Sequence, residues 1–144
     1  MKNIALILVL GLIITGCVYD QFNLSQIKNN SKSDVKIEIL YNKETFENNW
    51  DSKPYISYLR SFGLDSGAAL IDLDTINLIG RYNLRRNVVF DLGMSSGKFP
   101  NLDKFKKVTI IYPDSSLESI ASSEMGEKFK KNDDGEYVWA IQGR

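Results

Sequence analysis

The stretch that decides the fold is Val35-Lys36-Ile37-Glu38-Ile39-Leu40-Tyr41. Its odd-numbered side chains are β-branched or aromatic, and Lys36 and Glu38 alternate with them. A repeat of two with β-branched residues is typical of a β-strand that is buried on one face. We therefore expect a half-buried strand over residues 35–41.

Three segments further along the chain repeat this alternation. They are Val88, Phe90 and Leu92, then Val108, Ile110 and Tyr112, and finally Tyr137, Trp139 and Ile141. Residues 69–79 are also apolar, but their phase changes near Asp74, which predicts a bulge or a change of sheet. Turns or loops are predicted at Ser66-Gly67, Gly93–Gly97, Pro113-Asp114 and Asp133–Gly135.

Two short helices are predicted between the first strands. Residues 43–50 fit one helix, with Phe46 and Trp50 four positions apart. Residues 54–62 fit a second helix that begins near Pro54. Its apolar face comprises Tyr55, Leu59 and Phe62. We assign the aromatic side chains of both helices to the core, namely Phe46, Trp50, Tyr55, Tyr58 and Phe62. Exposed aromatic side chains would instead indicate a protein or glycan contact.

Residues 117–129 allow two interpretations. A capping box at Ser115 and Glu118 favours one helix, whereas Gly126 favours a short strand followed by a helix near residues 124–131. Either interpretation gives the same fold class. We expect an α+β domain of mainly antiparallel β-structure, a small sandwich-like sheet domain with two or three short helices.

The composition excludes several kinds of site. The chain has 144 residues, with 18 basic and 18 acidic side chains, one cysteine and no histidine. Without histidine there is no Ser-His-Asp triad, no Cys-His pair and no histidine-ligated metal. One cysteine forms no internal disulfide. The balanced charge gives no support for nucleic-acid binding, and we expect no metal and no cofactor.

The N-terminus has the pattern of a secretory signal that ends at the lone cysteine. Lys2 precedes an apolar run from Ile4 to Ile14, which is too short to span a hydrocarbon core that needs about 20 residues. Ile14-Thr15-Gly16-Cys17 resembles the lipobox of bacterial lipoprotein signal peptides. The resemblance implies that the Cys17 sulfur carries a diacylglycerol and that the chain is cut before this residue.

This resemblance divides the chain into three parts. We expect a signal peptide over residues 1–16, a lipidated N-terminus and tether over residues 17–34, and a single globular domain over residues 35–144. The alternative for part of the tether is a first strand that begins around Phe22 and Leu24. Residue 18 is Val rather than Asp, so the retention signal of enterobacterial inner-membrane lipoproteins is absent. Asp20 stands alone, without the acidic pair of surface-exported lipoproteins. We therefore expect a lipid-anchored envelope protein in the outer membrane, facing the periplasm.

Ser95 belongs to two catalytic motifs, but the rest of the sequence lacks the elements that either motif requires. Gly93-Met94-Ser95-Ser96-Gly97 matches the nucleophile elbow G-x-S-x-G, but that elbow needs a following helix and a histidine base. Pro100 comes soon after the serine instead. Ser95 and Lys98 match the S-x-x-K motif of penicillin-recognising enzymes, but the K-T-G and S-D-N elements are missing. We interpret this segment as a loop.

A basic cluster is the candidate binding site. Arg81, Arg85 and Arg86 carry guanidinium groups that suit carboxylates or phosphates, and Tyr82 can stack on a ring. We expect these four residues to bind an anion or an acidic partner surface. The alternative is a charged loop between strands that pairs with nearby acids.

Asp72 and Asp74 are the candidate carboxylate pair, because residues two apart on a strand face the same way. Such a pair can act in acid–base chemistry or hold Ca²⁺. An EF-hand loop that began at Asp72 would need glycine at position 77 and glutamate at position 83, where the chain has asparagine. The alternative is a solvated strand face or a paired surface charge.

The whole pattern is similar to small lipoproteins of Bacteroidota-type bacteria. The similarity rests on Thr15-Gly16-Cys17, on Asn29-Asn30-Ser31 before the first strand and on Asp134-Gly135-Glu136-Tyr137-Val138-Trp139. It implies membrane attachment through Cys17 and transfers no catalytic or binding residue.

We expect a non-enzymatic binding or structural module of the envelope, with a protein or a glycan as partner. One alternative is an inhibitor or immunity-type lipoprotein that blocks an envelope enzyme or toxin. Another is a carboxylate-based enzyme that acts on glycans.

Overall fold

β2 (Val35–Tyr41) lies in the middle of a five-stranded sheet, which confirms the strand predicted over these residues. The structure, a computed structural model, describes residues 22–49, 55–62, 67–97 and 99–143. We call the five-stranded sheet sheet B, and all its neighbouring strands are antiparallel. Its order is β3 (Ala69–Asp74), β4 (Ile79–Leu84), β2, β6 (Phe105–Ile111) and β7 (Leu117–Ala121).

A second, four-stranded sheet, sheet A, joins the two ends of the described chain. Its order is β5 (Val89–Ser96), β1 (Phe22–Asn29), β9 (Tyr137–Ile141) and β8 (Lys130–Lys131). β1 and β9 run parallel, whereas the other two pairs are antiparallel. The two mainly antiparallel sheets, with three short helices, confirm the predicted α+β fold class.

β1 corrects the predicted boundary of the domain. The tether predicted over residues 17–34 is wrong for residues 22–29, because β1 lies inside sheet A, between β5 and β9, and the strand considered around Phe22 and Leu24 is present. Residues 30–34 connect β1 to β2. The buried side chains of this strand include Asn23, Ser25 and Asn29, so it lacks an apolar alternation. Asn29 Nδ2 donates hydrogen bonds to the carbonyl oxygens of Ser33 and Leu84, at 2.9 and 3.1 Å. These bonds offset the cost of burying the amide.

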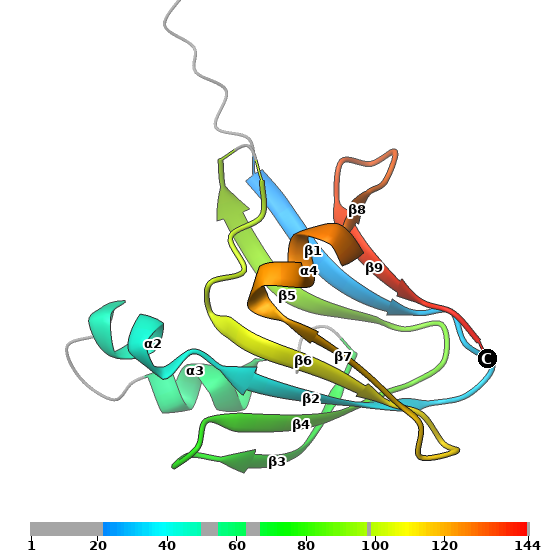
Figure 1. Cartoon of the computed structure of the whole chain (residues 1–144), viewed down its shortest axis with the longest axis horizontal. Helices are drawn as coiled ribbons and strands as arrows, with labels where there is room; N and C mark the ends of the chain where they lie inside the picture. Colours follow the sequence, from blue (N-terminus) through cyan, green and yellow to red (C-terminus); the bar gives the residue numbers. More distant parts are fainter. Residues whose placement is uncertain (1–21, 50–54, 63–66, 98, 144) are drawn as a thin grey trace, which may run out of the picture.

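In the described part of the chain, three short helices flank the sheets. They are α2 (Lys43–Asn49), α3 (Tyr55–Ser61) and α4 (Ser122–Lys128). The first two agree with the predicted helices, and α4 directly follows β7, so the strand-then-helix interpretation of residues 117–131 is confirmed. Figure 1 shows α2 and α3 at one end of sheet B, while α4 contacts β6 and β7.

Among the helices that the structure describes, none combines the length and the apolar character that crossing a membrane requires. The predicted signal peptide over residues 1–16, Cys17, Trp50 and Pro54 lie outside the described residues.

The core fills the space between the two sheets and is rich in aromatic rings. Phe62, just after α3, packs edge-on against Tyr41 of β2 and Phe90 of β5, with ring centroids 5.9 and 5.6 Å apart. Edge-on pairs of this kind stabilise a fold by about 0.5–1.5 kcal/mol each beyond their buried area. The apolar face predicted for the second helix is thus part of the core, with Tyr55, Leu59 and Phe62 all buried.

Two turns differ from their sequence interpretation. The phase change near Asp74 is a hairpin turn between β3 and β4, and the bulge in this pair lies earlier, at Ile71. The loop predicted from Gly93 is wrong as far as Ser96, because these residues continue β5. Gly93 has φ 108° and sits at a bulge opposite Ser25, a conformation that favours glycine.

Candidate functional site

The predicted basic cluster does not form one site. Arg81 and Tyr82 are neighbours on β4, so their side chains lie on opposite faces of sheet B. Tyr82 is fully buried, which corrects its predicted role in ligand binding. Arg85 and Arg86 are exposed beyond the end of β4. The Arg86 backbone N–H donates to Asp34 Oδ1 at 2.9 Å, which fixes this turn.

Arg81 is engaged by carboxylates of its own sheet. Its Nε donates to Glu38 Oε2 and its Nη1 to Asp72 Oδ2, both at 2.8 Å. The hydrogen bond and the charge of Glu38 raise the pKa of Arg81, and Asp72 adds to this effect. The ion triad supports the pairing with nearby acids that the alternative interpretation predicted. The loop predicted with it is wrong for Arg81 and Tyr82, because both lie on β4.

Both members of the candidate carboxylate pair are engaged in the β3–β4 hairpin. Asp72 pairs with Arg81, while Asp74 Oδ1 accepts the backbone N–H groups of Ile76 and Asn77 at 2.9 and 3.0 Å. Asp74 Oδ2 accepts the Asn77 amide at 2.7 Å. These bonds to Asn77 and Ile76 lower the pKa of Asp74. Among the described residues, no cluster of three or more acidic or cysteine side chains is arranged to hold a metal ion.

Ser95 lies on β5 rather than at a strand-to-helix turn, which contradicts the nucleophile-elbow geometry. Its Oγ accepts the backbone N–H of Asn101 at 2.8 Å. Lys98, the partner in the S-x-x-K motif, lies outside the described residues. The serine therefore fastens the segment after β5 to the strand.

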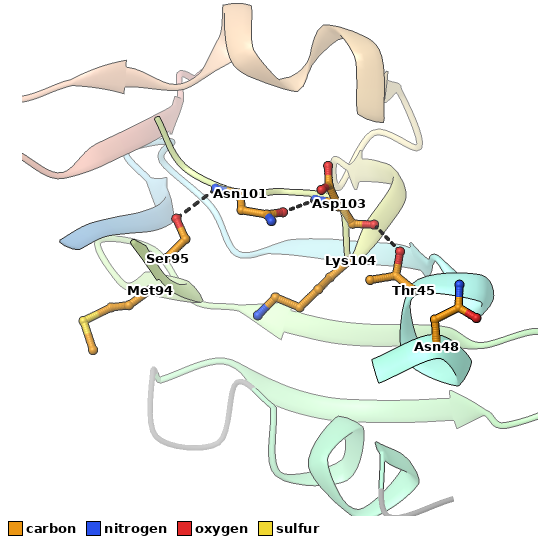
Figure 2. Close-up of a pocket in the computed structure, with 7 residues that line it drawn as sticks. All are labelled: Thr45, Asn48, Met94, Ser95, Asn101, Asp103 and Lys104. Atoms are coloured by element: carbon orange, nitrogen blue, oxygen red, sulfur yellow. Dashed lines mark hydrogen bonds between the residues drawn. The ribbon is translucent and has the colours of Figure 1, made fainter. Parts of the chain in front are cut away.

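That segment forms one wall of a hollow that we call the polar hollow (Figure 2). The hollow has a volume of about 450 Å³. Thr45 and Asn48 of α2 face Ser95 of β5, and residues 101–104 close it between them. Its full lining is Thr45, Asn48, Met94, Ser95, Asn101, Asp103 and Lys104.

Hydrogen bonds fix the segment between β5 and β6 against the start of α2. The Asp103 carbonyl oxygen accepts from Asn42 Nδ2 at 3.1 Å and from Thr45 Oγ1 at 3.2 Å. The Asn42 backbone N–H donates to the Lys104 carbonyl at 2.8 Å. Asn101 Oδ1 accepts the Asp103 N–H at 2.9 Å. Hydrogen bonds therefore hold residues 101, 103 and 104 of this wall in place.

Lys104 brings a positive charge beside an aromatic ring. Its Nζ donates to the Tyr58 hydroxyl at 3.4 Å and lies 5.8 Å from the centre of the Tyr58 ring. A Cβ at position 93 would lie 3.4 Å from Nζ, an ordinary contact, so Gly93 suits this position through its φ of 108° rather than through space. The amine is thus held between α3 and the bulge of β5, while the carboxylate of the exposed Asp103 points away from it (Figure 2).

Sequence reasoning missed the polar hollow, apart from Ser95, which it singled out for a different reason. The lining residues come from two regions that are far apart along the chain, residues 45–48 and residues 94–104, and neither forms a motif that indicates a hollow. The available signal was the polar residues Asn101, Asp103 and Lys104 directly before an apolar strand.

No family model, no curated protein and no solved structure matches the chain.

Proposed function

We propose that the chain is a lipid-anchored protein of the bacterial cell envelope, attached through Cys17, whose domain binds a ligand in the polar hollow. The lipobox-like Ile14-Thr15-Gly16-Cys17 supports the anchor. The observation that carries the binding role is the convergence of hydroxyl, amide and ammonium side chains on one hollow (Figure 2). Residue 18 is Val, which favours the outer membrane and a domain that faces the periplasm.

The lining favours a neutral glycan over an anion. Thr45, Ser95, Asn48 and Asn101 offer both donors and acceptors, which suit sugar hydroxyls and N-acetyl groups. Among the described lining residues Lys104 is the only cation, and its amine donates to the Tyr58 hydroxyl, so the hollow lacks a cluster of cations for a phosphate. Arg81, the best cation of the predicted cluster, is already paired with two carboxylates.

The same residues support binding without turnover. A serine nucleophile needs a nearby base, and the chain has no histidine. Lys104 directs its amine to the Tyr58 hydroxyl, and the Ser95 Oγ accepts a backbone hydrogen bond. Asp72 and Asp74, the carboxylates considered for glycan hydrolysis, belong to a hairpin of sheet B and do not line the polar hollow.

Calorimetry with a tetramer of N-acetylglucosamine tests the binding role on the purified full chain in detergent. We expect Asn48→Ala to raise the Kd at least fivefold. Asn48 is exposed on α2, and alanine has the higher helix propensity, so the variant keeps its fold. Asn83→Ala, on the outer face of β4, is the matched control. Equal affinities of the two variants, or no binding at millimolar tetramer, would contradict the proposal.

Labelling with radioactive palmitate in a bacterial host tests the anchor separately. The unchanged chain is expected to take up the label and to fractionate with membranes, whereas Cys17→Ala does neither. Equal labelling of the two chains would show that the lipid is not at Cys17.

A further inference from the structure

The outer face of sheet A carries a small apolar patch at the start of β1. Leu24 of β1 pairs with Met94 of β5, and Phe22 pairs with Ser96, in an antiparallel register. Phe22 and Met94 are therefore diagonal neighbours on one face, about 7–8 Å apart, which lies within reach of long side chains. We call Phe22, Leu24 and Met94 the apolar patch.

The patch faces away from the core. Asn23 and Ser25, which alternate with Phe22 and Leu24, are buried. Phe22 and Met94 each expose 68% of their surface, and Leu24 is half-buried. Two large, neighbouring apolar side chains exposed on one strand pair invite a covering surface.

The short stretch of chain between Phe22 and Cys17 identifies the bilayer as that covering surface. This inference rests on the proposed lipid attachment at Cys17. Cys17 and Phe22 are five residues apart, and five extended residues span at most about 18 Å. The lipid-bearing sulfur lies at the boundary between headgroups and acyl chains. Phe22 is thus confined to a thin zone above that boundary, where the patch meets the bilayer at a high effective concentration.

The remainder of the outer face is compatible with lipid headgroups. Lys28 of β1 pairs with Val89, and Lys130 of β8 pairs with Val138, so both lysines share the face with the patch. Both are exposed. Asp91, an acid on this face, accepts a hydrogen bond from Gln26 Nε2 at 2.8 Å. Lysines on the same face as an exposed aromatic side chain suit an anionic bilayer surface.

We infer that the outer face of β1 and β5 rests on the membrane that holds the lipid anchor, with Phe22 and Met94 in the headgroup region. The membrane surface then fixes the orientation of the domain. The polar hollow opens beside Ser95, the neighbour of Met94 on β5, so it lies close to the bilayer surface. A ligand that binds in the polar hollow therefore lies close to the membrane surface.

The test uses lipidated full-length protein in vesicles of phosphatidylethanolamine and phosphatidylglycerol. Lipidation consumes the thiol of Cys17, the sole cysteine, so Met94→Cys supplies a unique site for a bimane label. Ile76→Cys is the control, because Ile76 is 81% exposed in the β3–β4 turn of the other sheet. This turn lies far from the start of β1 in Figure 1. We expect a lipid with a nitroxide near its headgroup to quench the label at 94 at least twofold more than the label at 76.

The outcomes distinguish a failure of this inference from a failure of the proposed lipid anchor. Equal quenching at 94 and 76, in protein that floats with the vesicles, would overturn the inference and leave the anchor intact. A label at 94 that is shielded from aqueous iodide but not quenched by lipid would assign the patch to a second copy of the chain, which also overturns it. If unchanged protein accepts bimane at Cys17 and fails to float, the anchor itself is wrong. Phe22→Ser is expected to halve the lipid quenching at 94.

Discussion

Tyr41 and Tyr82 place their hydroxyl oxygens 2.7 Å apart in the core, where each is the other's partner. We expect Tyr82→Phe to lower the free energy of unfolding by about 1–3 kcal/mol, because it leaves the Tyr41 hydroxyl buried without this bond. The double variant Tyr41→Phe/Tyr82→Phe should lose less than the sum of the single changes, since no polar atom is left behind. Urea unfolding of the four proteins measures this coupling. Strictly additive losses would show that the bond contributes nothing.

The β3–β4 hairpin depends on the ionised form of Asp74. Its hydrogen bonds lower the pKa of this carboxyl in the folded state, so the unfolded chain binds a proton first as the pH falls. The stability it contributes is present above the unfolded pKa and is lost as the pH falls through the lower, folded value. We expect Asp74→Asn, which cannot titrate, to have a flatter stability curve between about pH 5 and pH 2. Chemical unfolding across this range tests it, and parallel curves for the two proteins would contradict it.

The first and last strands of the described chain are neighbours in the fold. β1 and β9 pair in parallel within sheet A, and both contribute side chains to the core between the sheets. We expect Ile27→Ala in β1 and Ile141→Ala in β9 each to cost about 2–5 kcal/mol, because both isoleucines are fully buried. Each change should lower the stability of both sheets together. Hydrogen exchange detects this, and protection lost in sheet A but kept in sheet B would refute a single cooperative unit.

Sequence alone predicted most of the strands whose inward residues are apolar. β2 was recognisable because Ile37 and Ile39 alternate with charged residues. β4 was missed although Tyr82 and Leu84 are buried, because the arginines in and just after it suggested a charged loop. β1 was recognisable only around Phe22 and Leu24, because its inward positions include Asn23 and Asn29, whose amides are satisfied by distant carbonyl groups. The continuation of β5 beyond Gly93 was hidden by a glycine-rich composition that equally fits a loop. The polar hollow was out of reach for a related reason, since hydrogen bonds between segments far apart along the chain create it.

The parallel pairing of β1 with β9 also has a consequence for the order of events during synthesis. The first described strand cannot gain this neighbour until the last one leaves the ribosome, more than 100 residues later. Contacts between such distant residues slow folding, because a long loop must close before they form. The nascent chain therefore cannot complete sheet A until its synthesis is nearly finished. Slow closure of this kind suits the export that we propose, because a chain that has not yet folded can pass through a translocation pore.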